Sequence, residues 1–478
     1  MLPMPITDSI FLLAESREHP VHVGGLQLFD LPEGAGPDYL GDMYRKLIAR
    51  DEVDHRFRNR AQRGISSLGQ WAWTPDEEFD LEYHVRLSAL PRPSRVRELL
   101  ALVSRLHGSL LDRHRPLWEC HLIEGVEGGR FAVYSKVHHS VYDGVSALAR
   151  SRRALSEDPD ARDQPPIWAL DSDRVEHRVP GINALIRQSV GDPLRTSGTV
   201  TRMVGDALGI GSAALGAVRQ ALSEQAQTLP LQAPRTMFNV PITGARRFAA
   251  QSWSLQRINA VRAATGATLN DVVLAMSSGA LRRYLLEFDA LPDRPLTAAV
   301  PISLRAASDE GGNAIGAILC DLATDAQDPA VRLDRIRASM RHGKQTFDGL
   351  TRLQITALTA AIASPLLAPM LPGGTALAPP GFNLIISNIP GPPRPLYWEG
   401  ARLRGIYPVS VPLDGQALNI TVTTYVDNLE FGLTGCRRSV PHLQRMLLHL
   451  EDSLVELERA VGGGGGKRRG QVRALRRR

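Results

Sequence analysis

The sequence has few cysteines and lacks several patterns that identify common protein classes. Its three cysteines, Cys120, Cys320 and Cys436, are far apart and form no CxxC pair, which argues against a disulfide framework and against a zinc site. No GxSxG motif is present, so a serine acyl-enzyme is not indicated. The N-terminus has no basic region ahead of an apolar run, so we expect no secretory signal, and the cysteine usage fits a reducing cytosol.

An excess of basic over acidic residues is absent outside the C-terminus. The net charge is +6, but Lys467 to Arg478 holds seven basic residues and no acid, which leaves −1 for the rest. A nucleic-acid-binding domain would carry its basic surface on the fold, so this class is not expected. Gly462 to Gly466 predicts a flexible linker. The basic tail would either touch anionic lipid or be a solvated end.

The stretch from Leu353 to Pro393 contains no charged residue. Pro365 and Pro369 interrupt its apolar part, which makes a straight transmembrane helix a poor interpretation. We favour buried core or the wall of a hydrophobic tunnel over a membrane-inserted segment. Either way, the chain offers a large apolar surface to a greasy ligand or a bilayer.

The length of 478 residues, 43% of them hydrophobic, predicts more than one domain. Helical and strand-like segments alternate in both halves, with a proline-rich, weakly helical region between them. We predict an N-terminal domain over 1–180, crossover helices over 181–245, a C-terminal domain over 246–460 and a tail over 461–478. Strands are expected at 79–87 and 383–387, among others, and a C-terminal helix at 440–460.

The most informative segment contains two adjacent histidines, His138 and His139. The β-prone run Arg130 to Lys136 precedes them, and Val145 to Leu155 has helical character, so the pair lies where a strand ends and a helix begins. Neighbouring residues on a strand point to opposite faces. We therefore expect one histidine to act in chemistry and the other to shape the turn.

A neutral histidine can take a proton from an alcohol and return it. His139 would deprotonate a bound hydroxyl, which would attack an activated acyl group directly. If that group is a thioester, its thiolate leaves without a strong acid. Asp143 would orient the loop by pairing with an arginine, and Gly144 would allow the tight backbone. A packed histidine without catalytic role remains an alternative, as does a metal site, although no third histidine at regular spacing supports one.

Several segments together resemble one family. His138-His139-Ser140-Val141-Tyr142-Asp143-Gly144 matches the HHxxxDG motif of CoA-dependent acyltransferases related to chloramphenicol acetyltransferase. Further stretches are similar to motifs of the bacterial wax ester synthase/diacylglycerol acyltransferase family, in the right order over roughly residues 4 to 460. These are the N-terminal signature Pro5 to Asp8 with His22 to Leu26, the PLW motif Pro116-Leu117-Trp118, the ND motif Asn270-Asp271 and the SNxPGP turn Ser387 to Pro392.

The resemblance implies an α/β fold with two chloramphenicol-acetyltransferase-like domains, each a mixed sheet flanked by helices, and a tunnel between them. Acyl-CoA would enter from one side and the alcohol from the other, meeting at His139 as general base. Asp143 would be structural, and Arg305, at the end of a strand, is our candidate for its partner. No metal and no bound cofactor are implied, because acyl-CoA is a substrate.

The other motifs have a functional and a structural interpretation. Asn270, beside Asp271 at a helix start, would position substrate or stabilise an oxyanion, or would belong to a helix cap. Pro116, Leu117 and Trp118 are expected in the wall of the tunnel. Ser387 and Asn388 would face the cleft or, more simply, form a structural turn.

The resemblance also implies partners and a location. The acceptor would be a diacylglycerol or a long-chain alcohol, and the motifs leave that choice open. The protein would be cytoplasmic, in peripheral contact with the inner face of the membrane or with lipid inclusions, and would bind no nucleic acid; its oligomeric state stays open. Two alternatives are a lipid-binding or scaffold protein of the same fold and an acyltransferase for a specialised metabolite.

Overall fold

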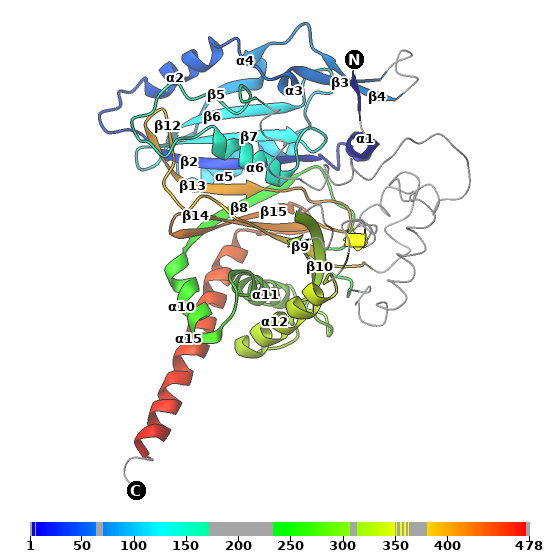
Figure 1. The fold of residues 1–478 in the computed structure, drawn as a ribbon, viewed down its shortest axis with the longest axis vertical. Coiled ribbons are helices and arrows are strands. Elements are labelled where there is room, and N and C mark those ends of the chain that lie inside the picture. The colour runs from blue at the N-terminus through cyan, green and yellow to red at the C-terminus, as the bar shows by residue number, and fades with distance from the viewer. Residues whose placement is uncertain are drawn as a thin grey trace, which may run out of the picture.

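Two six-stranded sheets form the framework of the computed structural model, one above the other in Figure 1. The structure describes residues 2–4, 6–63, 70–171, 233–305, 313–348, 350, 354–355, 358–359, 362 and 380–474. Each sheet is combined with helices, which confirms the predicted α/β fold with two mixed-sheet halves. The predicted crossover helices lie outside the described residues.

The first sheet has the order β12-β13-β2-β7-β6-β5. Its strands are β2 (His22–Asp30), β5 (Val85–Ala89), β6 (Trp118–Val126), β7 (Arg130–His138), β12 (Tyr397–Trp398) and β13 (Ala401–Val409). β6 and β7 form the predicted antiparallel hairpin, and β5 runs parallel to β6. β2 pairs with β7 so that His22 lies opposite His138.

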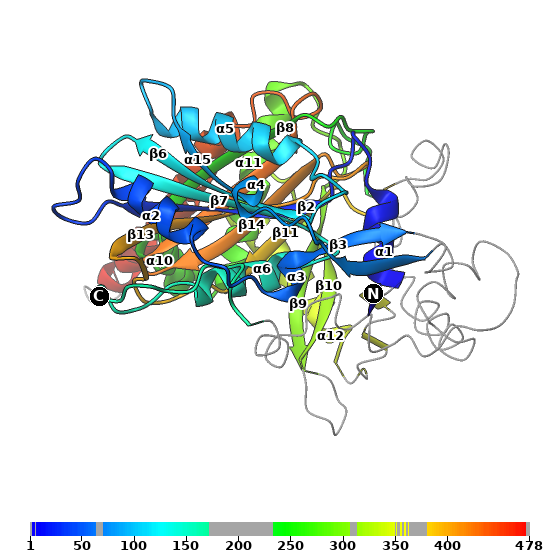
Figure 2. The same ribbon diagram turned by 90° about the horizontal axis from the view of Figure 1, so that it is seen from above.

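Helices cover both faces of the first sheet. α5 (Val96–Gly108) packs on one face, with β8 of the second sheet beside it, and α6 (Gly144–Arg153) packs on the other. Figure 2 shows the two helices on either side of the strands. The remaining elements of this half are α1 (Ile6–Ala14), α2 (Tyr39–Ile48), α3 (His55–Arg58), α4 (Leu81–His84) and a small sheet of β1 (Leu2–Pro3), β4 (Trp71–Pro75) and β3 (Asn59–Arg63).

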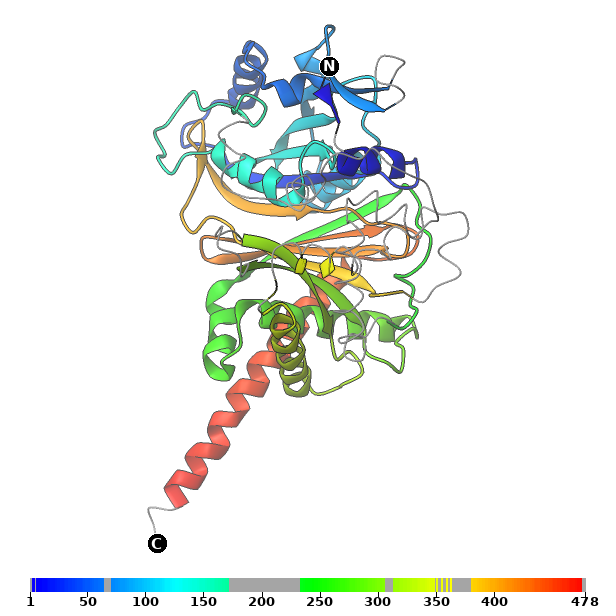
Figure 3. The same cartoon turned by 45° about the vertical axis from the view of Figure 1, so that its right-hand side comes forward.

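The second sheet has the order β10-β9-β11-β14-β15-β8. Its strands are β8 (Arg246–Ser254), β9 (Thr297–Arg305), β10 (Asn313–Asp321), β11 (Leu384–Ile389), β14 (Leu418–Tyr425) and β15 (Asn428–Cys436). β11 is parallel to both of its neighbours, and the other pairs are antiparallel. The helices α10 (Leu255–Thr265), α11 (Leu269–Glu287), α12 (Pro329–Gln345) and α15 (Arg445–Ala474) lie on the side away from the first sheet (Figure 3).

A segment from the second half of the chain completes the first sheet. β12 and β13 pair beside β2, and β13 also packs against β14 and β15 of the second sheet. The first sheet is therefore built from both halves of the chain. This exchange ties the halves together, while the division of the chain at 180 and 246 stays a prediction.

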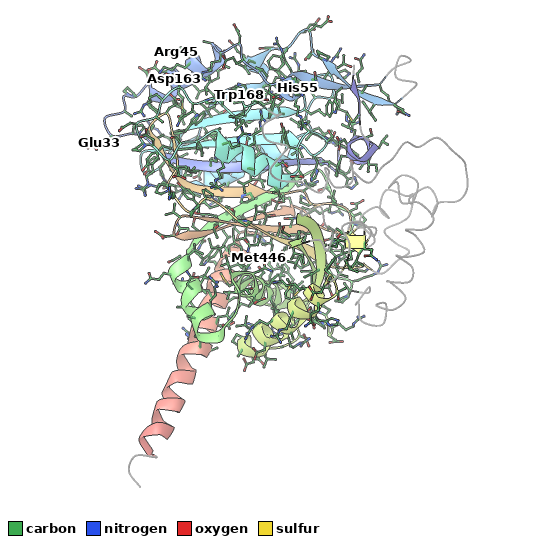
Figure 4. The ribbon with its side chains drawn as sticks, viewed as in Figure 1. Glu33, Arg45, His55, Asp163, Trp168 and Met446 are labelled. Atoms are coloured by element: carbon green, nitrogen blue, oxygen red, sulfur yellow. The ribbon has the colours of Figure 1, made fainter. Side chains whose placement is uncertain are left out.

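Each half has its own apolar core. Trp168 in the first half and Met446 in the second are both buried, and Figure 4 marks where they lie. Ile355, Leu358 and Ile362, from the charge-free stretch, are buried in the core of the second half, which favours the core interpretation for these three residues. Among the described helices, none is long and apolar enough to cross a membrane.

The predicted strand over 79–87 is wrong in its first part. Residues Leu81–His84 form the short helix α4, and β5 begins only at Val85. The Asp80 carboxylate accepts the N–H of Glu82 at 3.0 Å, which caps the first turn. A local cap of this kind competes with strand formation and overrides the alternation of apolar residues.

The C-terminal helix also differs from the prediction. α15 begins at Arg445 and continues through Gly462–Gly466 to Ala474, where a flexible linker was expected. Buried residues of its first turns, such as Leu450 and Leu454, anchor the helix in the core. Once a helix is anchored, each further residue adds a hydrogen bond without a new nucleus.

Candidate active site

The two histidines lie at the end of β7, where the backbone leaves the sheet. β7 ends at His138, and the N–H of Val141 closes a turn onto the His138 carbonyl at 2.9 Å. The N–H of His139 bonds to the carbonyl of Val21 at 3.0 Å, which ties the turn to the start of β2. Because the strand stops between the two histidines, their rings are placed in different surroundings.

His138 is completely buried, with Ser140 against one ring nitrogen and Glu15 near the other. Its Nδ1 accepts the N–H of Ser140 at 3.1 Å and lies 2.7 Å from the Ser140 hydroxyl. Because Nδ1 is an acceptor, the ring proton of the neutral form belongs on Nε2, which lies 3.5 Å from Oε1 of Glu15. These contacts support a role in shaping the turn.

Glu15 is a residue that the sequence analysis missed. Its buried carboxylate accepts the N–H of Val21 at 3.3 Å and pairs with Arg113, whose Nε donates at 3.1 Å. Burial raises the pKa of Glu15, but the hydrogen bond and charge of His138, together with Val21 and Arg113, outweigh burial and lower it. A lone acid directly after the apolar run of α1 was the available signal.

His139 has a different environment. Its ring stacks on Phe11 of α1, with centroids 4.4 Å apart and an interplanar angle of 28°. Burial lowers the pKa of His139, the negative charge of Asp143 raises it in part, and His138 lowers it further. The net direction favours a neutral imidazole at neutral pH, which is the form that can accept a proton.

Asp143 caps the helix that follows the histidines. Its carboxylate accepts the N–H of Ser146 at 2.8 Å, at the N-terminus of α6. Arg305 ends β9, but its side chain lies outside the described parts, so the pairing with Asp143 stays a prediction. Gly144 does not need the special backbone we expected, because it is absent from the glycines with positive φ. It opens α6 in ordinary helical geometry, with Val23 nearby.

The PLW motif lies beside the histidine turn. The carbonyl of Leu117 accepts the N–H of His138 at 2.9 Å, and Pro116 precedes it in a buried position. The Trp118 indole donates to the carbonyl of Phe57 at 2.8 Å and stacks on His84. The motif therefore holds the end of β7 and supplies a rigid wall.

A cavity lies between the first sheet and α6. It contains about 790 Å³ of empty space, part of which opens to solvent. Most of the lining is apolar, and the second half of the chain contributes Ile389 and Thr421 to it. The residues of the first sheet and α6 that line it include Val23, Gly25, Gln27, Trp118, Val137, Tyr142, Gly144, Ala147, Leu148, Ile406 and Pro408. Val137, before the histidine turn, and Tyr142 and Gly144, after it, line this space, whereas His139 itself is not among the lining residues.

The ND motif forms a helix start. Thr268 and Asp271 make a capping box, with the Asp271 carboxylate accepting the N–H of Thr268 at 2.8 Å. Asn270 is partly buried in the first turn of α11, which packs on α10, α12 and α15. Neither residue lines the cavity described above. The cap accounts for Asp271, and a role of Asn270 toward substrate stays a prediction.

The SNxPGP segment is not simply a turn. Ser387 and Asn388 belong to β11 and pair in parallel with Thr421 and Val422 of β14. The structural turn expected at these two residues is therefore wrong, because the sheet continues through Ile389 and Pro390 ends it by removing a backbone donor. Gly391 follows, and a side chain there would meet the carbonyl of Thr424 at 1.7 Å. Glycine is required by this close approach.

The described residues hold no cluster of three or more histidine, cysteine, aspartate or glutamate side chains that could bind a metal ion. Cys120, Cys320 and Cys436 are all free and buried. Burial raises the pKa of the Cys120 thiol to about 12 and that of Cys320 likewise to about 12. These two thiols are therefore unsuited to act as nucleophiles.

Comparison with known proteins extends the picture to the whole chain. Residues 4–273 match the model of the wax ester synthase/diacylglycerol acyltransferase catalytic domain, and residues 311–458 match the model of the C-terminal domain of that family. A protein of Mycobacterium tuberculosis H37Rv named probable diacylglycerol O-acyltransferase tgs2 is 51% identical over 463 residues, which covers 96% of this chain and 99% of the relative.

Solved structures agree with this. The wax ester synthase/diacylglycerol acyltransferase from Marinobacter aquaeolei VT8 is 45% identical, with a TM-score of 0.75 over 96% of this chain and all of that one. The first condensation domain of the calcium-dependent antibiotic synthetase shares the fold alone, at 16% identity and a TM-score of 0.56 over 96% of this chain and 95% of that one. By its catalytic-domain match and its full-length relatives, this chain belongs to the wax ester synthase/diacylglycerol acyltransferase family of acyltransferases.

Proposed function

We propose that the protein transfers a long-chain acyl group from acyl-CoA to the hydroxyl of a diacylglycerol, a long-chain alcohol or both. The observation that carries this proposal is the position of His139. It lies in a turn whose neighbouring residues Val137, Tyr142 and Gly144 line a largely apolar cavity, and its surroundings favour the neutral form. Relatives of this chain are named diacylglycerol O-acyltransferase and wax ester synthase, which supports both acceptor classes.

In the proposed reaction, His139 acts as general base. It takes the proton of the acceptor hydroxyl while the oxygen attacks the thioester carbonyl. The carbon–sulfur bond then breaks, and the CoA thiolate leaves and receives a proton from the imidazolium. The ester and free CoA are formed without a covalent acyl-enzyme. The pKa of Cys120 and Cys320 is raised by burial. Burial also raises the pKa of Cys436, but hydrogen bonds with Thr243 and Ser439 outweigh it and lower the value to about 7; Cys436 does not line the cavity.

The residues around His139 would act through position. Glu15 and Ser140 fix His138, and Asp143 fixes the start of α6, so the backbone on both sides of His139 is restrained. Restraint of this kind keeps the base within reach of a bound hydroxyl. Contact with a membrane or lipid inclusion, at the cytoplasmic side, belongs to the same proposal because both acceptors are poorly soluble in water.

The test compares wild type with His139→Ala, using a labelled long-chain acyl-CoA with hexadecanol or with a diacylglycerol. Loss of a general base is expected to lower the rate by about 10²–10⁴-fold. His55→Ala serves as the matched control, because His55 is exposed in the same half of the molecule (Figure 4). Equal rates in wild type and His139→Ala would remove the base from the mechanism. An inactive wild type that still binds acyl-CoA would favour a lipid-binding protein.

A further inference from the structure

Several polar side chains line the cavity beside α6, including Glu119, Ser135, Lys136 and Arg150, and one of them, Gln27, has a polar group without a partner. Gln27, on β2, lines the cavity and is only 8% exposed. Its amide nitrogen makes no hydrogen bond to any described residue. Among the described lining residues, no other holds a buried side-chain nitrogen or oxygen without a partner.

An amide in this position is costly without a partner. Its neighbours across the sheet are Val133 on β7 and Ile406 on β13, which offer no side-chain acceptor. A buried amide without a hydrogen bond destabilises the folded state, whereas an apolar residue of similar size would not. The empty side of the amide is the cavity itself, so a ligand that fills the cavity is the group that can satisfy it.

The distance of Gln27 from the histidine turn indicates which part of a bound ligand Gln27 would contact. Val23 lies at the end of the cavity near the histidine turn, because a side chain on Gly144 would lie 3.9 Å from Val23 Cγ1. Gln27 is four residues further along β2, which at about 3.3 Å per residue is roughly 13 Å away. A chain whose reacting end is at His139 would therefore pass Gln27 well along its length.

We propose that this cavity selects long-chain substrates that carry an oxygen function, a hydroxyl or a keto group, midway along the chain, and that Gln27 recognises it. The inference rests on the proposed function, since it needs a chain with its reacting end at His139. The amide is uncharged and has both donors and an acceptor, so it can bond to a hydroxyl or to a keto oxygen. A plain chain would leave the amide unsatisfied, and this difference is what produces selectivity.

The experiment measures kcat/KM for stearoyl-CoA and for a series of hydroxystearoyl- and oxostearoyl-CoAs that differ in the position of the oxygen. The same series of alcohols is tested as acceptors. We expect wild type to prefer oxygenated chains, with a maximum at one position in the middle of the chain. Gln27→Leu, which has a similar size but no polar group, should lower the oxygenated-to-plain ratio by roughly tenfold.

Ile406→Val is the matched control. Ile406 lines the cavity beside Gln27, as its register partner on the neighbouring strand β13. This variant therefore changes the volume of the cavity without changing its polarity. This variant should change kcat/KM for oxygenated and for plain chains by a similar factor, so the oxygenated-to-plain ratio should stay near that of wild type. A ratio that is the same in wild type and Gln27→Leu, in the donor series and in the acceptor series, would overturn the inference and assign the amide to bound water.

Binding provides a measurement that does not depend on turnover. Trp118 lines the same cavity, so tryptophan fluorescence can follow the binding of stearate and of the hydroxystearates to the full chain. If no acyl transfer occurs with any acyl-CoA, the proposed function fails, while a position-dependent affinity that Gln27→Leu abolishes would still support the recognition site. Acyl transfer without any such discrimination would overturn the recognition site alone.

Discussion

The two faces of the first sheet differ in what they bury. The α6 face contains the cavity, and its lining is mostly apolar. The α5 face buries a network of ionisable groups in which Lys136 is 1% exposed and lies 3.2 Å from Glu119. Both residues also border the cavity. The Lys136 ammonium also donates to the carbonyls of Leu106 and Ser109 at the end of α5, at 3.0 and 3.1 Å.

Histidines extend this network toward the second sheet. His22 Nε2 lies 2.7 Å from the carbonyl of His107, which it can bond, and His107 contacts the hydroxyl of Tyr134 at 2.8 Å and the carbonyl of Ser410 at 2.9 Å. Burial lowers the pKa of His107 to about 3, although its hydrogen bond to Ser410 acts in the opposite direction. His107 is therefore a neutral structural group, unlike the base that we propose at His139.

One strand, β7, contributes to both faces of the sheet. β7 carries Lys136 and His138 toward the rigid, hydrogen-bonded side. Val137 lines the cavity, and His139 follows the strand and stacks on Phe11. A catalytic base needs open space on one side and a fixed backbone on the other. The α5 face supplies the fixed backbone, and the α6 face supplies the space.

The largest effect on stability is expected from Lys136→Met. Removing the ammonium leaves the buried Glu119 carboxylate with His121 and Arg86 only, and leaves the carbonyls of Leu106 and Ser109 without their donor. This should lower the free energy of unfolding by about 3–5 kcal/mol. Urea denaturation of wild type and variant measures this loss. The double variant with Glu119→Gln should recover part of it, and a loss below about 1 kcal/mol would mean that the network contributes little.

A matched pair of leucines compares the packing of the two helices. Leu99 on α5 is 1% exposed and tightly packed, whereas Leu148 on α6 borders the cavity and is only partly buried. Leu99→Ala should cost about 2–5 kcal/mol, and Leu148→Ala about 1 kcal/mol or less, because the space beside Leu148 is already empty. Thermal and urea unfolding of both variants would show this order, and equal losses would contradict the difference in packing.

The α5 face should also respond to acid. Burial raises the pKa of Glu119, but a hydrogen bond from His121 and the charges of Lys136 and Arg86 lower it from 4.5 to about 2. A carboxyl with a lower pKa in the folded state stabilises the fold above the unfolded value and loses this contribution as pH falls toward the folded value. Wild type should therefore lose stability between pH 4.5 and 2 more steeply than Glu119→Gln. Parallel pH profiles of the urea midpoint would exclude Glu119 as a source of the slope.

The smallest effect is expected at the cap of α6. Asp143→Ala removes the acceptor for the Ser146 N–H and should cost about 1 kcal/mol. Asp143→Ser keeps a capping oxygen and should retain most of that stability. If Asp143→Ser is as stable as wild type but loses acyl transfer, the charge of Asp143 matters beyond the cap, as the predicted pairing with Arg305 requires.

Much of the local structure could be predicted from the sequence. The hairpin of β6 and β7 follows from two apolar runs around a glycine-rich turn, and Thr268 caps α11 as its residue type suggests. The position of His138 and His139 at a strand end also follows from local pattern, because alternation of side chains and helix caps act over a few residues. The sequence even separates the roles of the two histidines in outline.

Other features depend on contacts between distant residues. Glu15 is brought to His138 only because α1 folds over the end of β7, and nothing near either residue in the sequence records this. In the sequence, Gln27 is an ordinary polar residue on an alternating strand. Only the folded sheet places it at a largely apolar cavity. Asp271, part of a motif that suggested function, closes a helix cap instead of lining the cavity.

The family, the alternation of helices and strands and the place of the two histidines follow from the sequence alone, because residue types and short spacings carry this information. Only the tertiary structure decided that β13 completes the first sheet, that Glu15 holds His138 and that Gln27 faces the empty side of the α6 cavity. The physical reason is that burial and partnership are properties of pairs far apart in the chain. They arise when the backbone closes long loops, and local propensity does not encode which pairs will meet.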